Sequence, residues 1–370
     1  MLALGSTVSA KLAQIVYGGT MFVFNAWYVA GWSWDFPADK LTTMTMLNEP
    51  IVFYRKRDGG LVALQDRCVH RLAPLSLGCR EGDDLRCMYH GLKFAPTGKC
   101  IEIPGASAPI PERARVRSFP VIERHSWVWV WMGAAEAADP ALIPAAVGLD
   151  DPRWVLRTGQ LDYQANYQLI NDNLLDFSHL SYVHKNSFGA DEQWAHKRPH
   201  ITKLERGVHV ERWIENSAGF RHTQPVDQWT YYDFMTPGIL LLGSKTYPVG
   251  TAAASNGQAP LGEPLLETFS CQAVTPLTEV TSRYFFSWGP NAHQGAAEMA
   301  DLLIGVAGLA FAEDKVMIEA QQQVVLRSPG INAMPTPHDR AVLLFQRLMT
   351  SLARGDAEGI ENTAVSETAA

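Results

Sequence analysis

Four residues in the first third of the chain have types and spacings that suit metal chemistry. They are Cys68 and His70, which form a Cys-x-His pair, and Cys87 and His90, which form a Cys-x-x-His pair sixteen residues further on. In one class of 2Fe-2S cluster, two thiolates bind one iron and two imidazoles bind the other. Two short loops that each carry one Cys and one His supply this ligand set, so the spacing predicts one such cluster per chain.

Two Cys and two His are also the ligand set of a tetrahedral zinc site, which is the alternative for the same residues. Zinc fingers usually group Cys with Cys and His with His, whereas each short pair here contains one of each. The interleaving favours the mixed cluster, known as a Rieske cluster. The other three of the five cysteines, Cys79, Cys100 and Cys271, are expected to be ordinary buried thiols.

A second group of candidate ligands follows at residues 173–184, in the run Asn173-Leu-Leu-Asp176-Phe-Ser-His179-Leu-Ser-Tyr-Val-His184. Two histidines and a carboxylate can hold one Fe(II) and leave positions open for oxygen and substrate. At about 100° per residue, His179 and His184 would lie about 140° apart on a regular helix. One metal can bind both only where the helix breaks or bulges, so we predict a distorted helix.

The histidine pair alone is more typical of a core helix whose imidazoles satisfy hydrogen bonds. The upstream cluster changes this balance, because a one-electron carrier needs an acceptor within the same system. The two motifs together favour a mononuclear Fe(II), one per chain.

Several segments make the chain similar to the Rieske non-haem iron aromatic oxygenases, especially the group of vanillate O-demethylase, dicamba monooxygenase and toluenesulfonate monooxygenase. The similarity runs through residues 21–350. It includes Asn25-Ala-Trp-Tyr-Val-Ala, Ile51-Val-Phe-Tyr-Arg, His70-Arg-Leu-Ala-Pro-Leu-Ser-Leu-Gly, Cys87-Met-Tyr-His-Gly-Leu and Asp172-Asn-Leu-Leu-Asp-Phe-Ser-His. The resemblance implies an α+β chain, with an N-terminal all-β Rieske domain and a C-terminal helix-grip catalytic domain built on an antiparallel sheet.

The resemblance also implies the third iron ligand, which relatives take from a segment similar to residues 311–322. Asp314 matches that ligand, although Glu313 and Glu319 compete by chemistry alone. It further implies that Asp176 accepts a hydrogen bond from His90 of a neighbouring subunit and so couples the two metal centres. The alternative for Asp176 is an ordinary helix acid.

Two amides complete the candidate site. Asn173 lies near the iron in relatives with the Asn-x-x-Asp spacing, where it would shape the oxygen or substrate side, and a plain helix-surface amide is the alternative. Gln272 stands where one relative places a polar substrate contact. Asn173 and Asp176 are therefore the candidate catalytic residues, and Gln272 is the candidate substrate contact.

Composition agrees with a cytoplasmic catalyst of two domains: 370 residues, 47% hydrophobic and 19% charged. The formal net charge of −7 and the absence of Lys/Arg clusters argue against a nucleic-acid partner. Lys11 and Gln14 interrupt the apolar N-terminal stretch, so we expect no membrane segment. The sequence has no Gly-x-Gly-x-x-Gly loop, so we expect no NAD or flavin on this chain.

Turn residues and composition divide the chain. We expect an extension that is non-native or disordered, a Rieske domain, an Ala/Pro-rich linker, a catalytic domain and a disordered polar tail. Their ranges are 1–20, 21–134, 135–154, 155–354 and 355–370.

Apolar and β-branched runs predict the elements that hold the ligands. Helices at 166–184 and 298–327 should pack across an antiparallel sheet and bring the iron ligands together. Trp127, Trp129 and Trp131 mark one face of a strand and are expected in the core or at a subunit contact. Strands are predicted at 51–54, 61–64, 92–94, 206–214, 227–234, 238–243, 266–274 and 281–289.

The resemblance implies the oxygenase component of a multicomponent Rieske monooxygenase, with O₂ as co-substrate. We expect it to O-demethylate a methoxylated aromatic acid such as vanillate and to release formaldehyde. Electrons would come from a separate NAD(P)H-dependent flavin and iron-sulfur reductase, and the chain would form a head-to-tail homotrimer. The alternatives are ring, methyl or N-methyl hydroxylation of another aromatic and, more remotely, a Rieske electron carrier or sensor.

Overall fold

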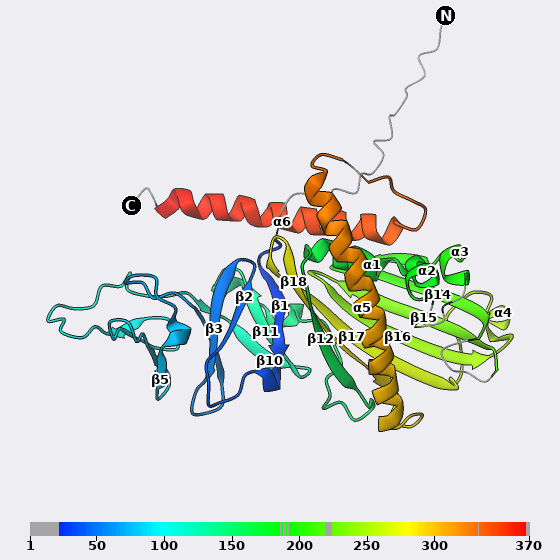
Figure 1. Cartoon of the computed structure of the whole chain (residues 1–370), viewed down its shortest axis with the longest axis horizontal. Helices are drawn as coiled ribbons and strands as arrows, with labels where there is room; N and C mark the ends of the chain where they lie inside the picture. Colours follow the sequence, from blue (N-terminus) through cyan, green and yellow to red (C-terminus); the bar gives the residue numbers. More distant parts are fainter. Residues whose placement is uncertain are drawn as a thin grey trace, which may run out of the picture.

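The computed structural model describes residues 22–185, 187, 190, 192–218, 224–331 and 333–367, with side chains described as far as residue 355. The extension expected at residues 1–20 lies outside this part of the chain. Figure 1 shows a part built of small sheets beside a part built on one large sheet, with helix α5 across the large sheet and the start of α6 along its upper edge. The predicted α+β class, a β-rich N-terminal domain followed by an antiparallel sheet with helices, is confirmed.

In the described residues, the N-terminal part holds three antiparallel sheets, with strand orders β1-β11-β10, β2-β3-β4-β9 and β5-β6-β7-β8. The strands expected at 51–54, 61–64 and 92–94 are confirmed as β3, β4 and β7. The full set is β1 (Ala26–Trp32), β2 (Thr42–Met46), β3 (Glu49–Arg55), β4 (Leu61–Gln65), β5 (Cys79–Glu81), β6 (Asp84–Arg86), β7 (Lys93–Phe94), β8 (Cys100–Glu102), β9 (Ser118–Phe119), β10 (Val121–Arg124) and β11 (Trp127–Met132).

Strand β11 is buried on both faces. Trp127, Trp129 and Trp131 lie in the main core as expected, but the residues between them are equally buried. The single buried face expected from the tryptophans is therefore wrong. The strand lies between β1 and β10, and its core continues without interruption into the catalytic part.

The two parts are joined by hydrogen bonds as well as by apolar packing. The Thr275 hydroxyl donates to the Val29 carbonyl at 2.7 Å, and the Leu47 N–H donates to the Pro276 carbonyl at 3.0 Å. Strand β17 thus contacts β1 and β2 of the N-terminal part directly. These bonds fix the small sheets against the large one.

The catalytic part is built on a seven-stranded antiparallel sheet within the described residues, in the order β12-β18-β17-β16-β15-β14-β13. All five strands predicted between 206 and 289 are confirmed as β14 to β18. The outer strands β12 and β13 were not predicted, because their mixed polarity lacks a clear alternation. The bounds are β12 (Arg157–Tyr163), β13 (His200–Leu204), β14 (Gly207–Ser217), β15 (Val226–Met235), β16 (Ile239–Pro248), β17 (Leu266–Thr278) and β18 (Thr281–Pro290).

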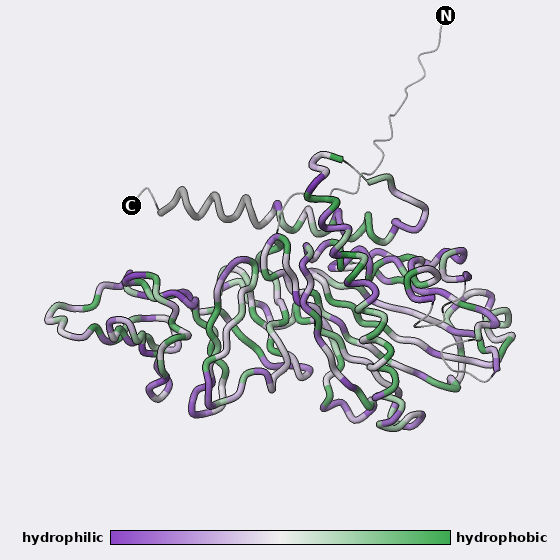
Figure 2. Tube along the Cα trace, viewed as in Figure 1, coloured by the Kyte–Doolittle hydropathy of each residue, from purple (hydrophilic) through white to green (hydrophobic). Residues whose placement is uncertain are grey.

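Two long helices cover this sheet. Helix α5 (Ala297–Arg327) confirms the helix predicted at 298–327 and packs on β18 and β12, while α6 (Arg340–Glu367) packs on β14. In Figure 2, hydrophilic residues gather in loops at the strand ends, and α5 carries hydrophobic and hydrophilic residues along its length. This is the pattern of a helix with one face on a sheet.

The tail expected to be disordered begins at residue 355. The bounds of α6 run to Glu367, but the side chains beyond residue 355 lie outside the described part of the chain, so this expectation stays a prediction.

The predicted distortion between Asn173 and His184 is confirmed. Helix α1 (Tyr167–Leu175) ends before Asp176, whose φ of −118° and ψ of 96° are extended. A turn η5 (Phe177–His179) and a short helix α2 (Leu180–Val183) follow. The Asp176 carboxylate accepts the Ser178 N–H at 2.8 Å and thereby starts the new turn.

The predicted linker contains two short turns, η3 (Ala135–Ala137) and η4 (Pro140–Leu142). None of the helices in the described residues combines the length and the apolar run that crossing a bilayer requires. The remaining short elements are η1 (Ser33–Asp35), η2 (Leu75–Leu77), α3 (Gln193–His196) and α4 (Thr251–Ala254).

One buried carboxylate ties the loops at the far end of the large sheet. Asp227 is 1% exposed, and its two oxygens accept the N–H groups of Asn216, Gly250 and Ala252 at 2.9 Å each. Asp227→Asn replaces one acceptor with a donor and leaves a buried N–H unpaired, at a cost of about 1–3 kcal/mol. We expect calorimetry to show a Tm lower by about 1–4 °C.

The matched control is Asp301→Asn on α5, whose exposed ion pair with Arg157 is worth about 0–1 kcal/mol. Its Tm should stay close to that of the wild type. Equal Tm values for the two variants would contradict the role of Asp227.

Candidate metal centres and active site

The two loops that carry the cluster candidates have the same backbone hydrogen bonding. In each loop the cysteine N–H donates to the carbonyl five residues later, and the residue four positions later donates back to the cysteine carbonyl. The bonds are Cys68 N to Ala73 O (2.8 Å), Leu72 N to Cys68 O (3.0 Å), Cys87 N to Leu92 O (2.8 Å) and Gly91 N to Cys87 O (2.9 Å).

Each loop also needs one left-handed residue at the same place. Leu72 has φ of 60° and Gly91 has φ of 77°. A Cβ at Gly91 would lie 2.8 Å from Pro104 Cγ, so close packing and backbone conformation both favour glycine there. The loops therefore present two equivalent cysteines, although their spacings to histidine differ.

The four side chains divide into a buried and an exposed pair. Cys68 and Cys87 are buried, while His70 and His90 are exposed with ring centroids 4.5 Å apart. Burial and the neighbouring Cys87 thiol raise the pKa of Cys68 to about 11. Such a thiol becomes a thiolate when a metal replaces its proton. Two thiols inside and two imidazoles outside fit a 2Fe-2S cluster with mixed ligands.

An ion-pair network supports the second loop. The Arg86 guanidinium donates to the Gly91 carbonyl at 2.6 Å and pairs with Glu81 and Glu102. Arg86 and then Lys93 lower the pKa of Glu102 to about 2. The network fixes the carbonyl next to His90 and so helps to place that imidazole.

One cysteine departs from the sequence expectation. Cys100 and Cys271 are buried as predicted, but Cys79 is exposed at the start of β5, with its Sγ 3.6 Å from Met88 Sδ. Strand β5 is the edge strand of its four-stranded sheet, so one side of it has no neighbouring strand in that sheet.

The second constellation converges on one point. The ligand atoms of His179, His184 and Asp314 lie within 4.8 Å of one another. Asp314 Oδ1 is 3.2 Å from His184 Nε2 and 3.5 Å from His179 Nε2. His184 is 1% exposed and Asp314 is 3% exposed. Helix α5 thus carries the carboxylate to the break between α1 and α2.

Both imidazoles are oriented by their other nitrogen. His179 Nδ1 bonds to the main-chain carbonyl of Asp176, and His184 Nδ1 bonds to Glu313 Oε2 at 2.9 Å. These bonds direct both Nε2 atoms toward Asp314. Holding Nδ1 in this way is how proteins prepare histidines for a metal, so the three residues fit a two-His, one-carboxylate iron site.

Burial and charge act differently on the two histidines. Burial lowers the pKa of His179 despite the opposing effect of Asp314. Burial would also lower the pKa of His184, but the Asp314 and Glu313 carboxylates outweigh it and raise that pKa. A metal ion takes over this compensation, because it binds neutral imidazole and balances the buried carboxylate.

The structure separates Asp314 from its two competitors. Glu313 points to His184 Nδ1, while Glu319 accepts the Gln164 N–H at 2.7 Å, away from the histidines. Of these three acids, Asp314 alone joins the ligand group. No motif in the sequence indicated that Glu313 would orient a ligand.

Asn173 is a direct partner of the carboxylate. Its Nδ2 donates to Asp314 Oδ1 at 3.0 Å, and the side chain also lines the cavity described below. It is therefore not a plain surface amide. The bond fixes one carboxylate oxygen and leaves Oδ2 free of this contact.

Asp176 lies beside the trio without contacting it through its carboxylate. Both carboxylate oxygens bond to Ser178 at 2.8 Å. The buried Arg212, which donates to the Trp194 carbonyl at 3.1 Å, interacts electrostatically with Asp176. Figure 1 shows the sheet that contains β5, next to the cluster loops, at the opposite end of the molecule from α1 and α2. A contact between His90 and Asp176 thus needs a second chain.

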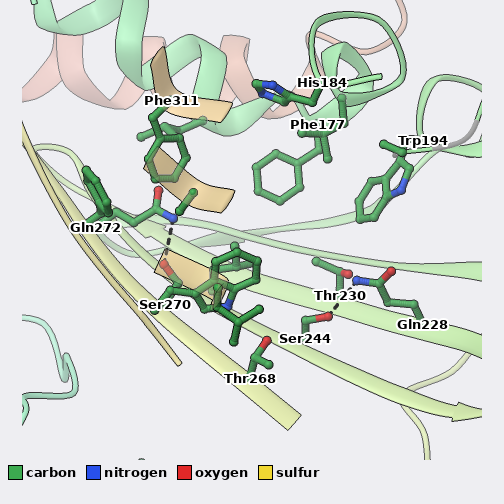
Figure 3. A pocket seen from close by; sticks show the side chains of 18 of the residues that line it. Phe177, His184, Trp194, Gln228, Thr230, Ser244, Thr268, Ser270, Gln272 and Phe311 are labelled. Atoms are coloured by element: carbon green, nitrogen blue, oxygen red, sulfur yellow. Dashed lines mark hydrogen bonds between the residues drawn. The ribbon is translucent and has the colours of Figure 1, made fainter. Parts of the chain in front are cut away.

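A cavity of about 200 Å³ opens beside the ligand group. Its roof is largely apolar and comes from α1, η5, α2, α3 and α5, while its floor comes from β14 to β18 (Figure 3). Roof residues include Phe177, Leu180, Trp194 and Phe311, and floor residues include Gln228, Thr230, Ser244, Thr268, Ser270 and Gln272.

Gln272 is part of this floor. Its Nε2 donates to Ser270 Oγ at 2.9 Å, and its Oε1 accepts from the Tyr284 hydroxyl. The other polar floor residues were missed from the sequence. Their signal was a polar residue at every second position of the predicted strands, as in Gln228-Trp-Thr230 and Thr268-Phe-Ser270.

Comparison with known families assigns both parts of the chain. Residues 26–120 match the Rieske 2Fe-2S domain, and residues 163–355 match the vanillate O-demethylase oxygenase C-terminal domain. The first match contains all four cluster candidates, and the second contains His179, His184 and Asp314.

Relatives match over nearly their whole length. The iron-sulfur subunit TsaM1 of the toluene-4-sulfonate monooxygenase system of Comamonas testosteroni is 37% identical, over 92% of this chain and 99% of its own. The vanillate O-demethylase oxygenase subunit of Pseudomonas sp. (strain HR199 / DSM 7063) is 32% identical, over 94% and 100%.

A solved structure shows the same architecture. The crystal structure of dicamba monooxygenase with non-haem iron and dicamba superposes with a TM-score of 0.73 at 28% identity, covering 92% of this chain and 99% of that one. Together with the buried ligand group and the paired cysteine loops, these matches mean that the chain belongs to the Rieske non-haem iron oxygenases, with a 2Fe-2S cluster and a mononuclear iron as its cofactors.

Proposed function

We propose that this oxygenase component removes the methyl group of a methoxylated aromatic acid such as vanillate. The observation that carries the proposal is the buried His179, His184 and Asp314 group beside an aromatic-roofed cavity. A relative named for vanillate O-demethylation and a solved relative that holds dicamba support the substrate class.

The overall reaction balances with one electron pair. One O₂, NAD(P)H and a proton convert the methyl ether to a phenol, formaldehyde, water and NAD(P)⁺. Hydroxylation of the methyl group gives a hemiacetal, which collapses to the phenol and formaldehyde. When bound, the iron and the cluster supply oxygen activation and single-electron delivery.

The residues of this chain position the reactants. Phe177, Trp194 and Phe311 form the apolar roof and hold the aromatic ring. The roof also keeps water from the reacting methyl group. Asn173 fixes Asp314 Oδ1, so the carboxylate keeps one orientation while the aromatic substrate enters and leaves the cavity.

Electron supply requires other chains. We place a separate NAD(P)H-dependent flavin and iron-sulfur reductase upstream, and we assign the oxygenase to a cytoplasmic homotrimer. The exposed cluster tip, where Leu72 is 66% and Tyr89 is 61% exposed beside His70 and His90, supports a docking role. In a head-to-tail ring this tip would meet Asp176 of the next subunit.

A second candidate function is hydroxylation of a ring, a methyl substituent or an N-methyl group. The 37% identical relative named for toluene-4-sulfonate favours it, because toluene-4-sulfonate has no methoxy group. The complete ligand group and cavity oppose the remaining possibility of an electron carrier or sensor.

The first test measures formaldehyde. The oxygenase, purified with its iron and supplied with NADH and a compatible reductase, should release one formaldehyde per vanillate consumed. Hydroxylation of the vanillate ring instead predicts a hydroxylated product without formaldehyde. Consumption of vanillate without formaldehyde would therefore defeat the O-demethylase proposal.

The second test counts metals. Asp314→Asn removes the buried negative charge that balances a divalent ion, so iron should fall from about three to about two per chain. The cluster absorbance should not change. Glu319→Gln on the same helix is the matched control and should keep about three; equal iron in both variants would refute Asp314 as a ligand.

The third test separates electron transfer from metal binding. Asp176→Asn keeps the shape of the side chain but removes its charge, so both metals should be retained while coupled turnover falls about tenfold or more. Stopped-flow reoxidation of the reduced cluster should slow in parallel. Asp233→Asn, an acid in β15 that pairs with His209, is the control, and normal coupled turnover in Asp176→Asn would rule out the bridging role.

A further inference from the structure

The cavity floor carries a row of hydroxyl groups across three strands. Thr230 of β15 is directly opposite Ser244 of β16, and Ser244 is directly opposite Thr268 of β17. Side chains at such positions lie next to each other on one face of a sheet. All three line the cavity, and Figure 3 shows them on the side away from His184.

Neighbouring amides turn part of this floor into hydrogen-bond donors. Gln228 Nε2 donates to Ser244 Oγ at 2.9 Å, and Gln272 Nε2 donates to Ser270 Oγ at 2.9 Å. A serine hydroxyl that already accepts a bond retains its proton for another partner. Ser244 and Ser270 can therefore both donate to an atom in the cavity.

Thr230 gives the strongest sign of a missing ligand. It is 4% exposed, and its Oγ1 has no hydrogen-bond partner within the described part of the chain. An unpaired buried hydroxyl costs free energy, so such a group next to a cavity points to a partner that enters with the ligand.

The described lining of this cavity contains no lysine or arginine. Strand alternation places Lys245, the neighbour of Ser244, on the other face of the sheet, where it pairs with Glu267 at 3.2 Å. The buried Arg212 donates to the Trp194 carbonyl and is not among the lining residues. Among the described residues, the floor therefore offers neutral donors.

We propose that Thr230, Ser244 and Thr268 form the subsite for the acid group of the aromatic substrate, as a carboxylate or a sulfonate. Several neutral donors suit an oxyanion, because hydrogen bonds to a charged acceptor are about twice as strong as neutral ones. With the acid on the floor, the opposite end of the ring faces the His179, His184 and Asp314 group. The inference rests on the proposed function and specifies how the acid is held.

The test is calorimetric binding to the anaerobic, iron-loaded oxygenase without reductase, so that no turnover occurs. The probes are vanillate, toluene-4-sulfonate and the neutral amide vanillamide. Thr230→Val keeps the side-chain shape but removes the hydroxyl, so the Kd for both acids should rise at least tenfold. The Kd for vanillamide should rise less.

Three further variants make the result specific. Thr230→Ser restores the hydroxyl and should keep the Kd within threefold of the wild type, and Ser244→Ala should weaken both acids if Thr230→Val does not fold. Thr236→Val is the matched control, since Thr236 is also 4% exposed with an unpaired hydroxyl but lies outside the cavity lining. It should bind both acids normally.

Wild-type affinity for both acids in Thr230→Val and Ser244→Ala would overturn the subsite. An equal loss for vanillamide and vanillate, or no binding of either acid to the wild type at millimolar concentration, would overturn it too. The proposed function fails separately: toluene-4-sulfonate binding that depends on Thr230, without formaldehyde from vanillate, would preserve the subsite and remove O-demethylation.

Discussion

The carboxylate of Asp314 is the constraint on which the catalytic part depends. A carboxylate that is 3% exposed is costly unless other groups compensate it. Its nearest partners come from both sides of the helix break: Asn173 from α1, and His179 and His184 from the segment after it. Because α5 carries the carboxylate, these helices must meet at one place over the sheet. Removing the metal would leave the same groups together with their charges unbalanced.

The break at Asp176 makes that meeting possible. Its carboxylate starts the next turn through Ser178, while its main-chain carbonyl orients His179. Asp176 therefore follows the last residue of α1, orients the ligand His179 and places a partly exposed carboxylate beside the metal site. Because this carboxylate is bonded to Ser178, it does not contact the three ligands. The Asp176 carboxylate is partly exposed, so a partner from outside can reach it. The cluster loops lie at the far end of the molecule, where His70 and His90 are exposed to solvent.

The sequence predicted best where chemistry restricts spacing. Cys68 and His70 implied one cluster loop, and the spacing of five positions from His179 to His184 required a broken helix, which the structure contains. The choice of Asp314 over Glu313 needed resemblance, since adjacent acids are chemically equal until about 100° of helix rotation points them apart. In the structure, Glu313 instead forms a hydrogen bond with His184 Nδ1. The hydroxyl floor could not be foreseen, because alternating polar residues are also the pattern of a solvent-facing strand.

The fold places the metal ligands and the cavity floor on different elements. The groups that hold metal lie on helices and at a helix break, where each position depends on long-range contacts. The floor lies on β15 to β17, whose backbone bonds persist whatever side chains point into the cavity. Exchanging Thr230 or Ser244 should therefore change which acceptor is bound without moving Asp314. On this proposal, substrate choice in this chain rests on residues that the metal centre does not use, while relatives named for vanillate and for toluene-4-sulfonate match the same two-part chain.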